Sequence, residues 1–144
     1  MKRQILLTVN ILTIVLLGAC GGTSQSTAPP TPSGEIEYGL APVESVEVVF
    51  LESFPLQVQL QVAGYFPDGC TEIESTEVER QGNVFNVTLR TTRPTDVACT
   101  EAIEPFEINI PLDVYGLLAG EYSVDVNGVE AAFTFEQDNI LEGE

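Results

Sequence analysis

The stretch Leu56-Gln57-Val58-Gln59-Leu60-Gln61-Val62 decides the fold class, because its apolar and polar residues alternate without a break. Successive side chains of a β-strand point to opposite faces of a sheet, so this order puts the aliphatic residues on one face and the glutamines on the other. An amphipathic helix would need apolar residues every three or four positions. The segment therefore predicts a strand with one buried face and one face in water.

The same period of two recurs on both sides of this segment. Gln81-Gly82-Asn83 and Asn127-Gly128 are typical of tight turns that join paired strands. No segment keeps an apolar period of 3.6 residues for three turns, and only residues 112–119 leave room for one short helical turn. Strands are expected at residues 46–50, 56–62, 71–80, 85–90, 106–110, 122–126 and 129–135. Within residues 71–80, Ile73 and Val78 have opposite parity, which predicts a bulge between them.

The segment Leu117-Leu118-Ala119-Gly120-Glu121-Tyr122-Ser123-Val124 resembles the entry to the sixth strand of immunoglobulin-like and fibronectin-type domains. In those domains a tyrosine at this place bonds its hydroxyl to the backbone just upstream, an arrangement called a tyrosine corner. The resemblance implies an all-β fold: a single immunoglobulin-like β-sandwich of about seven antiparallel strands, with Tyr122 buried. It implies no activity, since this architecture carries many functions.

The start of the chain resembles the signal peptide and lipobox of bacterial lipoproteins. Lys2 and Arg3 precede an apolar stretch from Ile5, which ends in Leu17-Gly18-Ala19-Cys20. A helix over that stretch is about 20 Å long, well short of the roughly 30 Å hydrocarbon core of a bilayer, so it is typical of a signal peptide. The resemblance implies cleavage before Cys20 and acyl chains, palmitate among them, on its modified terminus. An ordinary secreted protein and a short uncleaved anchor are the alternatives.

These features predict how the chain is organised and where it resides. A signal peptide is expected over residues 1–19, a lipidated cysteine and disordered tether over 20–40, the sandwich over 41–137 and an acidic tail over 138–144. The tether prediction rests on the small, polar and proline residues of 21–34, which cannot bury apolar area. We expect a protein of the bacterial cell envelope, held in the membrane by its lipid and facing the periplasm or the exterior.

The charge of the chain limits its partners and its chemistry. Its net charge is −17, and beyond the leader only Arg80, Arg90 and Arg93 oppose all 22 acidic residues. This charge repels phosphate backbones, so we expect no nucleic acid. It either attracts a protein partner or ligand of basic character or serves solubility alone. The chain has no His, and its only Lys lies in the leader. Histidine triads, Schiff-base lysines and the usual zinc sites are thereby excluded, and we expect no enzyme activity, cofactor or metal.

Two cysteines remain after Cys20, namely Cys70 and Cys99. The cell envelope permits disulfides, and an even pair in that compartment predicts one bridge. In a sandwich of alternating strands both cysteines fall in connections at the same end, as a bridge requires. A redox pair is the alternative, although such pairs usually have Cys-x-x-Cys spacing.

Two loops joined by this bridge are the candidate ligand site. The first contains Tyr65, Phe66 and Asp68, and the second runs from Thr92 to Pro105. Loops on a rigid scaffold commonly carry binding residues, and the two aromatic rings either anchor a partner or cap the open end of the core. The candidate ligand-binding residues are Tyr65, Phe66, Asp68, Arg93, Asp96, Glu101 and Glu104.

A second hypothesis concerns carboxylates of this end. Asp68, Glu72, Asp96 and Glu101 form either a Ca²⁺ site or a set of solvated acids, with a paired-carboxylate hydrolase as a distant third. The sequence favours a noncatalytic binding module displayed from the envelope. The alternative is a structural or accessory lipoprotein subunit of a larger envelope complex.

Overall fold

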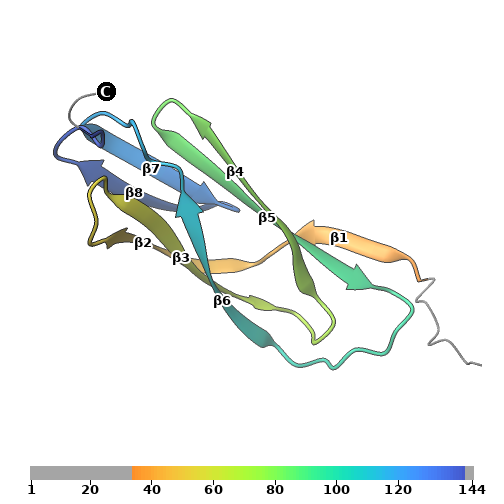
Figure 1. Ribbon diagram of the computed structural model, residues 1–144. Coiled ribbons are helices and arrows are strands. Elements are labelled where there is room, and N and C mark those ends of the chain that lie inside the picture. Colours follow the sequence, from red (N-terminus) through yellow and green to blue (C-terminus); the bar gives the residue numbers. More distant parts are fainter. Residues whose placement is uncertain (1–33, 142–144) are drawn as a thin grey trace, which may run out of the picture. The chain divides into compact units, whose positions relative to one another are not determined.

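The computed structural model describes residues 34–141, which fold into eight strands in two sheets without a helix (Figure 1). The strands are β1 (Ile36–Leu40), β2 (Val43–Leu51), β3 (Gln57–Phe66), β4 (Glu72–Gln81), β5 (Val84–Pro94), β6 (Glu104–Leu112), β7 (Gly120–Val126) and β8 (Val129–Phe135). The all-β fold class is as expected. In this part of the chain no helix is long and apolar enough to cross a membrane. The lipobox and most of the tether lie outside the described residues.

The smaller sheet has the order β2-β3-β6 and is antiparallel throughout. The alternating segment that predicted a strand forms most of β3. Val58, Leu60 and Val62 are at most 1% exposed, while the glutamines between them are exposed or only half-buried. The prediction for this segment is therefore confirmed face by face.

The larger sheet is mixed, which corrects the expectation of an all-antiparallel sandwich. β5 pairs with β4 on one side, and on its other side with β1 along one half and β7 along the other. The β5–β7 pair is parallel, and β8 then pairs with β7. In immunoglobulin domains the third strand lies beside the sixth and antiparallel to it. Here the strand beside β7 is β5, and it runs parallel to β7.

The composition of the two strands explains this order. β5 carries a buried apolar row, Phe85, Val87 and Leu89, at most 2% exposed. β4 carries four glutamates and only half-buried or exposed apolar residues, so it is suited to the edge, where charged side chains stay in water. The predicted bulge is present, as a register shift between Ile73 and Ser75.

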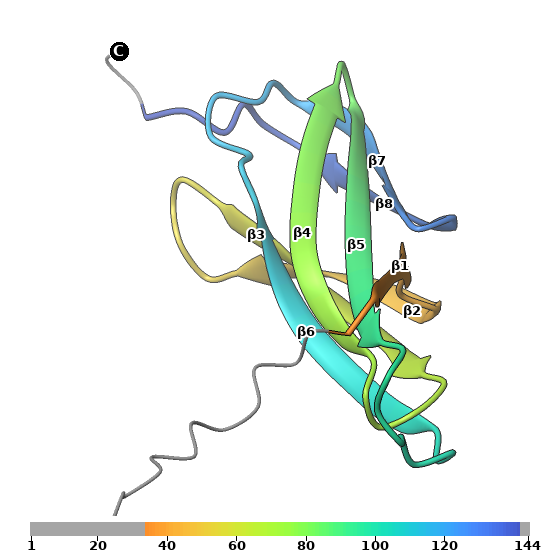
Figure 2. The same ribbon diagram turned by 90° about the vertical axis from the view of Figure 1, so that its right-hand side faces the viewer.

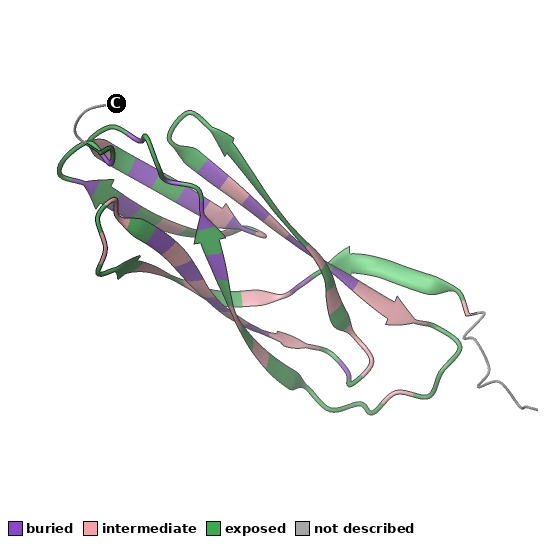
Figure 3. Ribbon diagram, in the orientation of Figure 1, coloured by how far each residue is buried: buried purple, intermediate pink, exposed green. Residues whose placement is uncertain are grey.

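Aromatic rings of β5, β7 and β8 fill the core between the sheets. Tyr122 stacks on Phe133 with ring centroids 5.4 Å apart, and Phe135 meets both rings edge-on. The Tyr122 hydroxyl donates to the backbone oxygen of Leu118 at 2.9 Å, and the side chain is only 5% exposed. The predicted burial and hydrogen bond of Tyr122 are confirmed. Figure 3 shows the buried positions alternating along β3, β5 and β7.

The junction of β1 and β7 beside β5 is closed by one side chain, that of Asn127. The Asn127 amide accepts from the Leu89 nitrogen and donates to the oxygens of Leu89 and Ala41, each at 3.0 Å. Asn127 has φ of 49°, a conformation that asparagine tolerates better than most residues. The predicted Asn127-Gly128 turn is thus present, and it also joins two strands that lie end to end.

Both predicted domain boundaries need correction. Residues 36–40, assigned to the tether, form β1 in the larger sheet. Asn139, assigned to the acidic tail, is 1% exposed, and its side-chain amide binds the Leu56 backbone on both its N–H and its oxygen and also the Val114 oxygen. In the sequence, β1 follows directly on the polar stretch of residues 21–34, and Asn139 lies among the acidic residues near the end of the chain. The helical turn allowed over 112–119 is absent, and a turn at Tyr115-Gly116 stands there instead.

Candidate functional site

The loop between β3 and β4 is built around the carboxylate of Asp68. Oδ1 accepts hydrogen bonds from the backbone nitrogens of Cys70, at 2.9 Å, and Thr71, at 3.0 Å, and from the Thr71 hydroxyl at 3.0 Å. An aspartate commonly organises a turn by accepting from backbone two residues on. The carboxylate of Asp68 therefore holds the backbone of this loop in its turn.

A disulfide joins this loop to the long connection before β6. Cys70 and Cys99 are bonded with their Cα atoms 5.5 Å apart, and the Gly69 nitrogen donates to the Thr100 oxygen at 3.1 Å. A Cβ on Gly69 would stand 2.3 Å from the Thr100 hydroxyl oxygen, so any other residue there would force the Thr100 side chain to move. The predicted pairing of the two cysteines is present. We call this end of the sandwich the bridged end. Figure 2 shows both loops at the tip opposite the hairpin that joins β4 and β5.

Asp68 also forms an ion pair that links the loop to β5. Its Oδ2 accepts from Arg93 Nε at 2.5 Å. This bond, reinforced by the backbone N–H of Cys70, lowers the pKa of Asp68 from 3.8 to about 2. The same bond and the charge of Asp68 raise the pKa of Arg93, with a further contribution from Glu37 on β1. Both groups are therefore charged across the physiological pH range.

An open pocket of about 370 Å³ lies between this ion pair and β1. One wall is the Pro67–Thr71 loop and the other is the strand β1. The residues around it are Glu37, Tyr38, Gly39, Leu40, Pro42, Pro67, Asp68, Thr71, Thr91 and Arg93. It offers one arginine, two carboxylates and hydroxyls, a set suited to recognising polar groups.

The aromatic candidates do not line this pocket. Phe66 stacks on Phe106 of β6 with ring centroids 4.8 Å apart, and both Phe66 and Tyr65 are half-buried. Tyr65 lies in β3 opposite Pro105. The structure thus places both rings within the paired strands of the smaller sheet.

The acidic candidates beyond Asp68 also lie outside the pocket. Asp96 and Glu101 are exposed in the connection after β5, and Glu104 is exposed at the start of β6. Of the seven candidate residues, the pocket brings together only Asp68 and Arg93.

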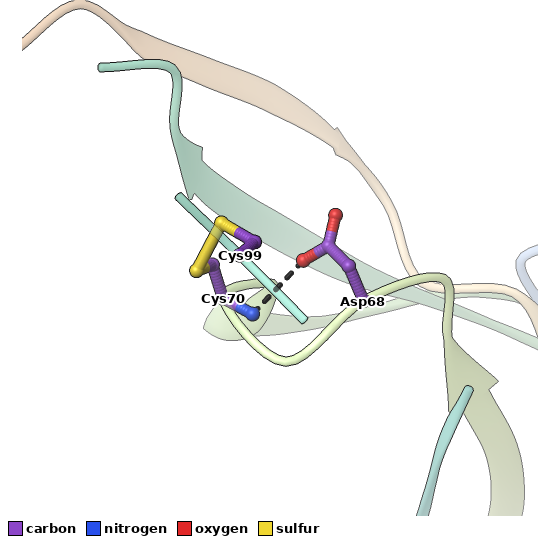
Figure 4. Close-up of side chains that lie close together, drawn as sticks. All are labelled: Asp68, Cys70 and Cys99. Carbon is purple, nitrogen blue, oxygen red and sulfur yellow. Dashed lines mark hydrogen bonds between the residues drawn. A yellow bond between two sulfur atoms is a disulfide. The ribbon is translucent and has the colours of Figure 1, made fainter. Parts of the chain in front are cut away.

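Of the two alternatives for Asp68, Glu72, Asp96 and Glu101, a gathered Ca²⁺ site is not formed. Over residues 34–141 the one close group of candidate metal ligands is Asp68 with Cys70 and Cys99, whose donor atoms lie within 4.8 Å of one another (Figure 4). Both sulfurs are bonded to each other, and the carboxylate is already bound by Arg93 and backbone N–H groups. Cysteine binds a metal ion as a thiolate, which a disulfide sulfur is not, so these residues do not fit a metal ion.

The largest group of pocket residues that sequence reasoning missed lies on β1. Glu37, Tyr38, Gly39 and Leu40 form one wall of the pocket. A signal was available, since Ile36, Tyr38 and Leu40 alternate with Glu37 and Gly39. The segment is short and follows a polar, proline-rich stretch, which hides it among the residues of the expected tether.

Comparison with known proteins identifies the family. The family model of the ORF11 beta-sandwich domain matches residues 60–136. An uncharacterized 10.2 kDa protein in the HgiCIIM 5′ region of Herpetosiphon aurantiacus is 36% identical over 90 residues, which are 62% of this chain and 95% of the relative. A second such protein, in the HgiBIM 5′ region of the same organism, is 38% identical over 80 residues, 56% of this chain and 96% of the relative. No solved structure matches. The chain belongs to the ORF11 beta-sandwich family.

Proposed function

We propose that this member of the ORF11 beta-sandwich family is a bacterial envelope lipoprotein that displays a small noncatalytic binding module. The observation that supports binding is the pocket between β1 and the Pro67–Thr71 loop. Its walls are held by the disulfide and by the Asp68–Arg93 ion pair, so little conformational freedom remains to be lost when a ligand binds.

The composition of the pocket supports a noncatalytic role. Its ionised groups are Arg93, Asp68 and Glu37, and the first two neutralise each other. A hydrolytic site would need a base beside a nucleophile, with a pKa suited to proton transfer near neutral pH. The lowered pKa of Asp68 makes it a poor base, and the chain has no histidine to serve instead.

The lipid anchor is supported by the sequence alone. Leu17-Gly18-Ala19-Cys20 follows a basic start and an apolar stretch, and a polar, proline-containing segment separates Cys20 from β1. More than one acyl chain is needed for stable anchoring, because each buried methylene contributes only about 0.8 kcal/mol. We propose that the sandwich is held at the membrane of the cell envelope by this terminus.

An accessory subunit of a larger envelope complex is the second candidate. It is favoured by the exposed apolar side chains of β1, with Tyr38 68% and Leu40 56% exposed.

A kinship with immunoglobulin-like domains is supported by the Tyr122 hydroxyl bond. Because β5 lies between β4 and β7, we propose that the domain is a variant of the immunoglobulin-like architecture.

Intact mass spectrometry of the protein recovered from bacterial membranes tests the anchor. We expect a mature chain that begins at a lipid-modified Cys20, and a Cys20→Ser variant that remains unprocessed or leaves the membrane. The matched control replaces Cys70 and Cys99 together by serine, which removes the bridge and should leave the lipid in place. A mature terminus at another residue would refute the anchor.

Affinity capture of the full chain from solubilised envelopes separates the two candidate roles. A single stoichiometric protein favours the accessory subunit, while soluble or surface ligands favour the binding module. Replacing Arg93 by Gln should weaken capture by a pocket-dependent module. Capture that Arg93→Gln leaves unchanged contradicts the pocket as the site.

A further inference from the structure

β1 is an edge strand whose outer side is open. Within residues 34–141 it pairs with β5 alone, and the backbone bonds from the Ala41 nitrogen to Leu89 and from the Thr95 nitrogen to Glu35 establish which residues face β5. Bonding alternates along an antiparallel pair. The backbone N–H and C=O groups of Ile36, Tyr38 and Leu40 therefore point away from β5, at the open edge. Figure 3 shows β1 exposed along its whole length.

Three of the other outer strands carry features that discourage pairing, and the fourth, β8, lies against β2, whereas β1 lacks such features. β4 has four glutamates, and β6 contains Pro105 and Pro111. β2 has a bulge near Ser45 and lies against β8. Charges, prolines and bulges are the usual means by which proteins protect sheet edges. β1 has no proline, no lysine and no bulge, and its one charged residue is Glu37.

The pocket at the bridged end runs along this open edge. Tyr38 and Leu40 line it together with Glu37 and Gly39, although the two pairs lie on opposite faces of β1. A strand added beside β1 would therefore place its inward side chains over the pocket. Gly39 has no side chain to cover that space, and Glu37 adds negative charge beside it.

We propose that β1 binds an extended, basic segment of a partner protein as an additional strand of the larger sheet. Main-chain hydrogen bonds to Ile36, Tyr38 and Leu40 supply affinity that does not depend on the sequence of the segment. Pockets for alternate side chains supply the specificity. Lysine or arginine side chains of the segment enter the pocket near Glu37. The inference rests on the proposed binding role and names its partner class, but it does not depend on the lipid anchor.

Charge selects a basic partner over a second copy of this chain. Beyond the leader the chain has 22 acidic residues and three arginines. Of these arginines, Arg93 binds Asp68 and Arg90 lies 3.5 Å from a Glu77 carboxylate oxygen. A second copy would bring the same excess of acid to the interface, whereas a basic segment is attracted to it.

A short capped peptide in which lysine alternates with valine is the probe, titrated against the full chain. We expect saturable binding that weakens as salt is raised. The matched peptide in which glutamate replaces lysine should not bind. A third peptide, with N-methyl groups on the edge that would face β1, should also fail, because it keeps the charge and loses the backbone donors.

The decisive pair of variants is Tyr38→Pro and Tyr38→Thr. The Tyr38 N–H faces the open edge, so proline there leaves the β1–β5 bonds intact and removes one donor from the partner. Threonine removes the ring and keeps the donor. We expect Tyr38→Pro to bind the lysine peptide about tenfold more weakly than Tyr38→Thr, the effect of about one hydrogen bond. Glu37→Gln should also weaken binding of the lysine peptide.

Three results would overturn the proposal. They are equal binding by Tyr38→Pro and Tyr38→Thr, equal binding of the lysine and glutamate peptides, and a dimer of this chain that Tyr38→Pro dissolves. If Tyr38→Pro does not fold, the N-methylated peptide on the unchanged protein decides the same question. Peptide failure combined with Arg93-dependent capture of another ligand rejects the β1 site and retains the binding module.

Discussion

The sharpest stability test concerns Asn127, whose side chain closes the gap between β1 and β7. Replacing it by glycine keeps the backbone freedom that φ of 49° requires and removes the amide. The Leu89 nitrogen and the Ala41 oxygen then lose their partners, whereas the Leu89 oxygen keeps its bond from the Ala41 nitrogen. Leu89 is 0% and Ala41 2% exposed, so water does not easily replace the amide.

The expected loss follows from these two groups. Each buried, unsatisfied backbone group costs about 1–3 kcal/mol, so Asn127→Gly should lower the free energy of unfolding by about 2–6 kcal/mol. That is a large share of the roughly 5–15 kcal/mol that stabilises a typical domain. Asn127→Asp keeps the acceptor for Leu89 but turns a carboxylate oxygen toward the Ala41 carbonyl, so it should also be strongly destabilising.

Urea denaturation followed by circular dichroism measures the effect. The matched control is Asn83→Gly in the other hairpin turn, where the side chain makes one exposed bond, to the Glu121 oxygen. We expect the control to lose at most about 1 kcal/mol. If Asn127→Gly were no more destabilised than Asn83→Gly, the junction of β1 and β7 would not depend on the amide, and the reasoning above would be wrong.

Three further outcomes are expected from the same protein. Tyr122→Phe should lower the unfolding free energy by about 1–3 kcal/mol in urea denaturation, because the bond from the buried Tyr122 side chain to the Leu118 oxygen is lost; a neutral result would contradict the tyrosine corner. Thiol titration of the unreduced, denatured protein should find neither Cys70 nor Cys99 free, and replacing both by serine should cost about 2–4 kcal/mol. The pKa of Asp68 is lowered from 3.8 to about 2. The contribution of its ionised carboxylate to the unfolding free energy is therefore complete above pH about 4 and is lost as the pH falls toward 2. Asp68→Asn should therefore be less stable than the parent at neutral pH and should lose less stability between pH 5 and pH 2; parallel acid profiles would argue against the Arg93 pair.

The candidate site was predicted only in part, for a reason visible in its residues. Asp68 and Arg93 were named because the sequence placed them in two loops joined by the disulfide. In the structure Arg93 lies near the end of β5, and both residues line the pocket. Tyr65 and Phe66 were named for their aromatic rings, but loop and strand cannot be distinguished where alternation weakens at the end of β3. β1 was missed because five residues carry too short a pattern to stand out from a polar segment.

The sequence by itself determined which segments form most of the strands, and for four of them which face is buried. Alternation did so for β3, β5, β7 and β8, since the period of two is a property of each strand alone. The disulfide followed from the number of cysteines and the expected compartment, and the buried Tyr122 hydroxyl followed from the resemblance of its segment to immunoglobulin-like domains. These features depend on local geometry and on the chemistry of single side chains.

Only the tertiary structure decided which strands are neighbours. Every strand presents the same backbone donors and acceptors, so the alternating pattern of β5 does not say whether β4 or β5 lies beside β7. The same holds for Asn127 and Asn139, whose amides bind backbone groups distant in the sequence. The open edge of β1 belongs to this class, because an edge exists only once the order of the sheet is set by the burial of all its strands together.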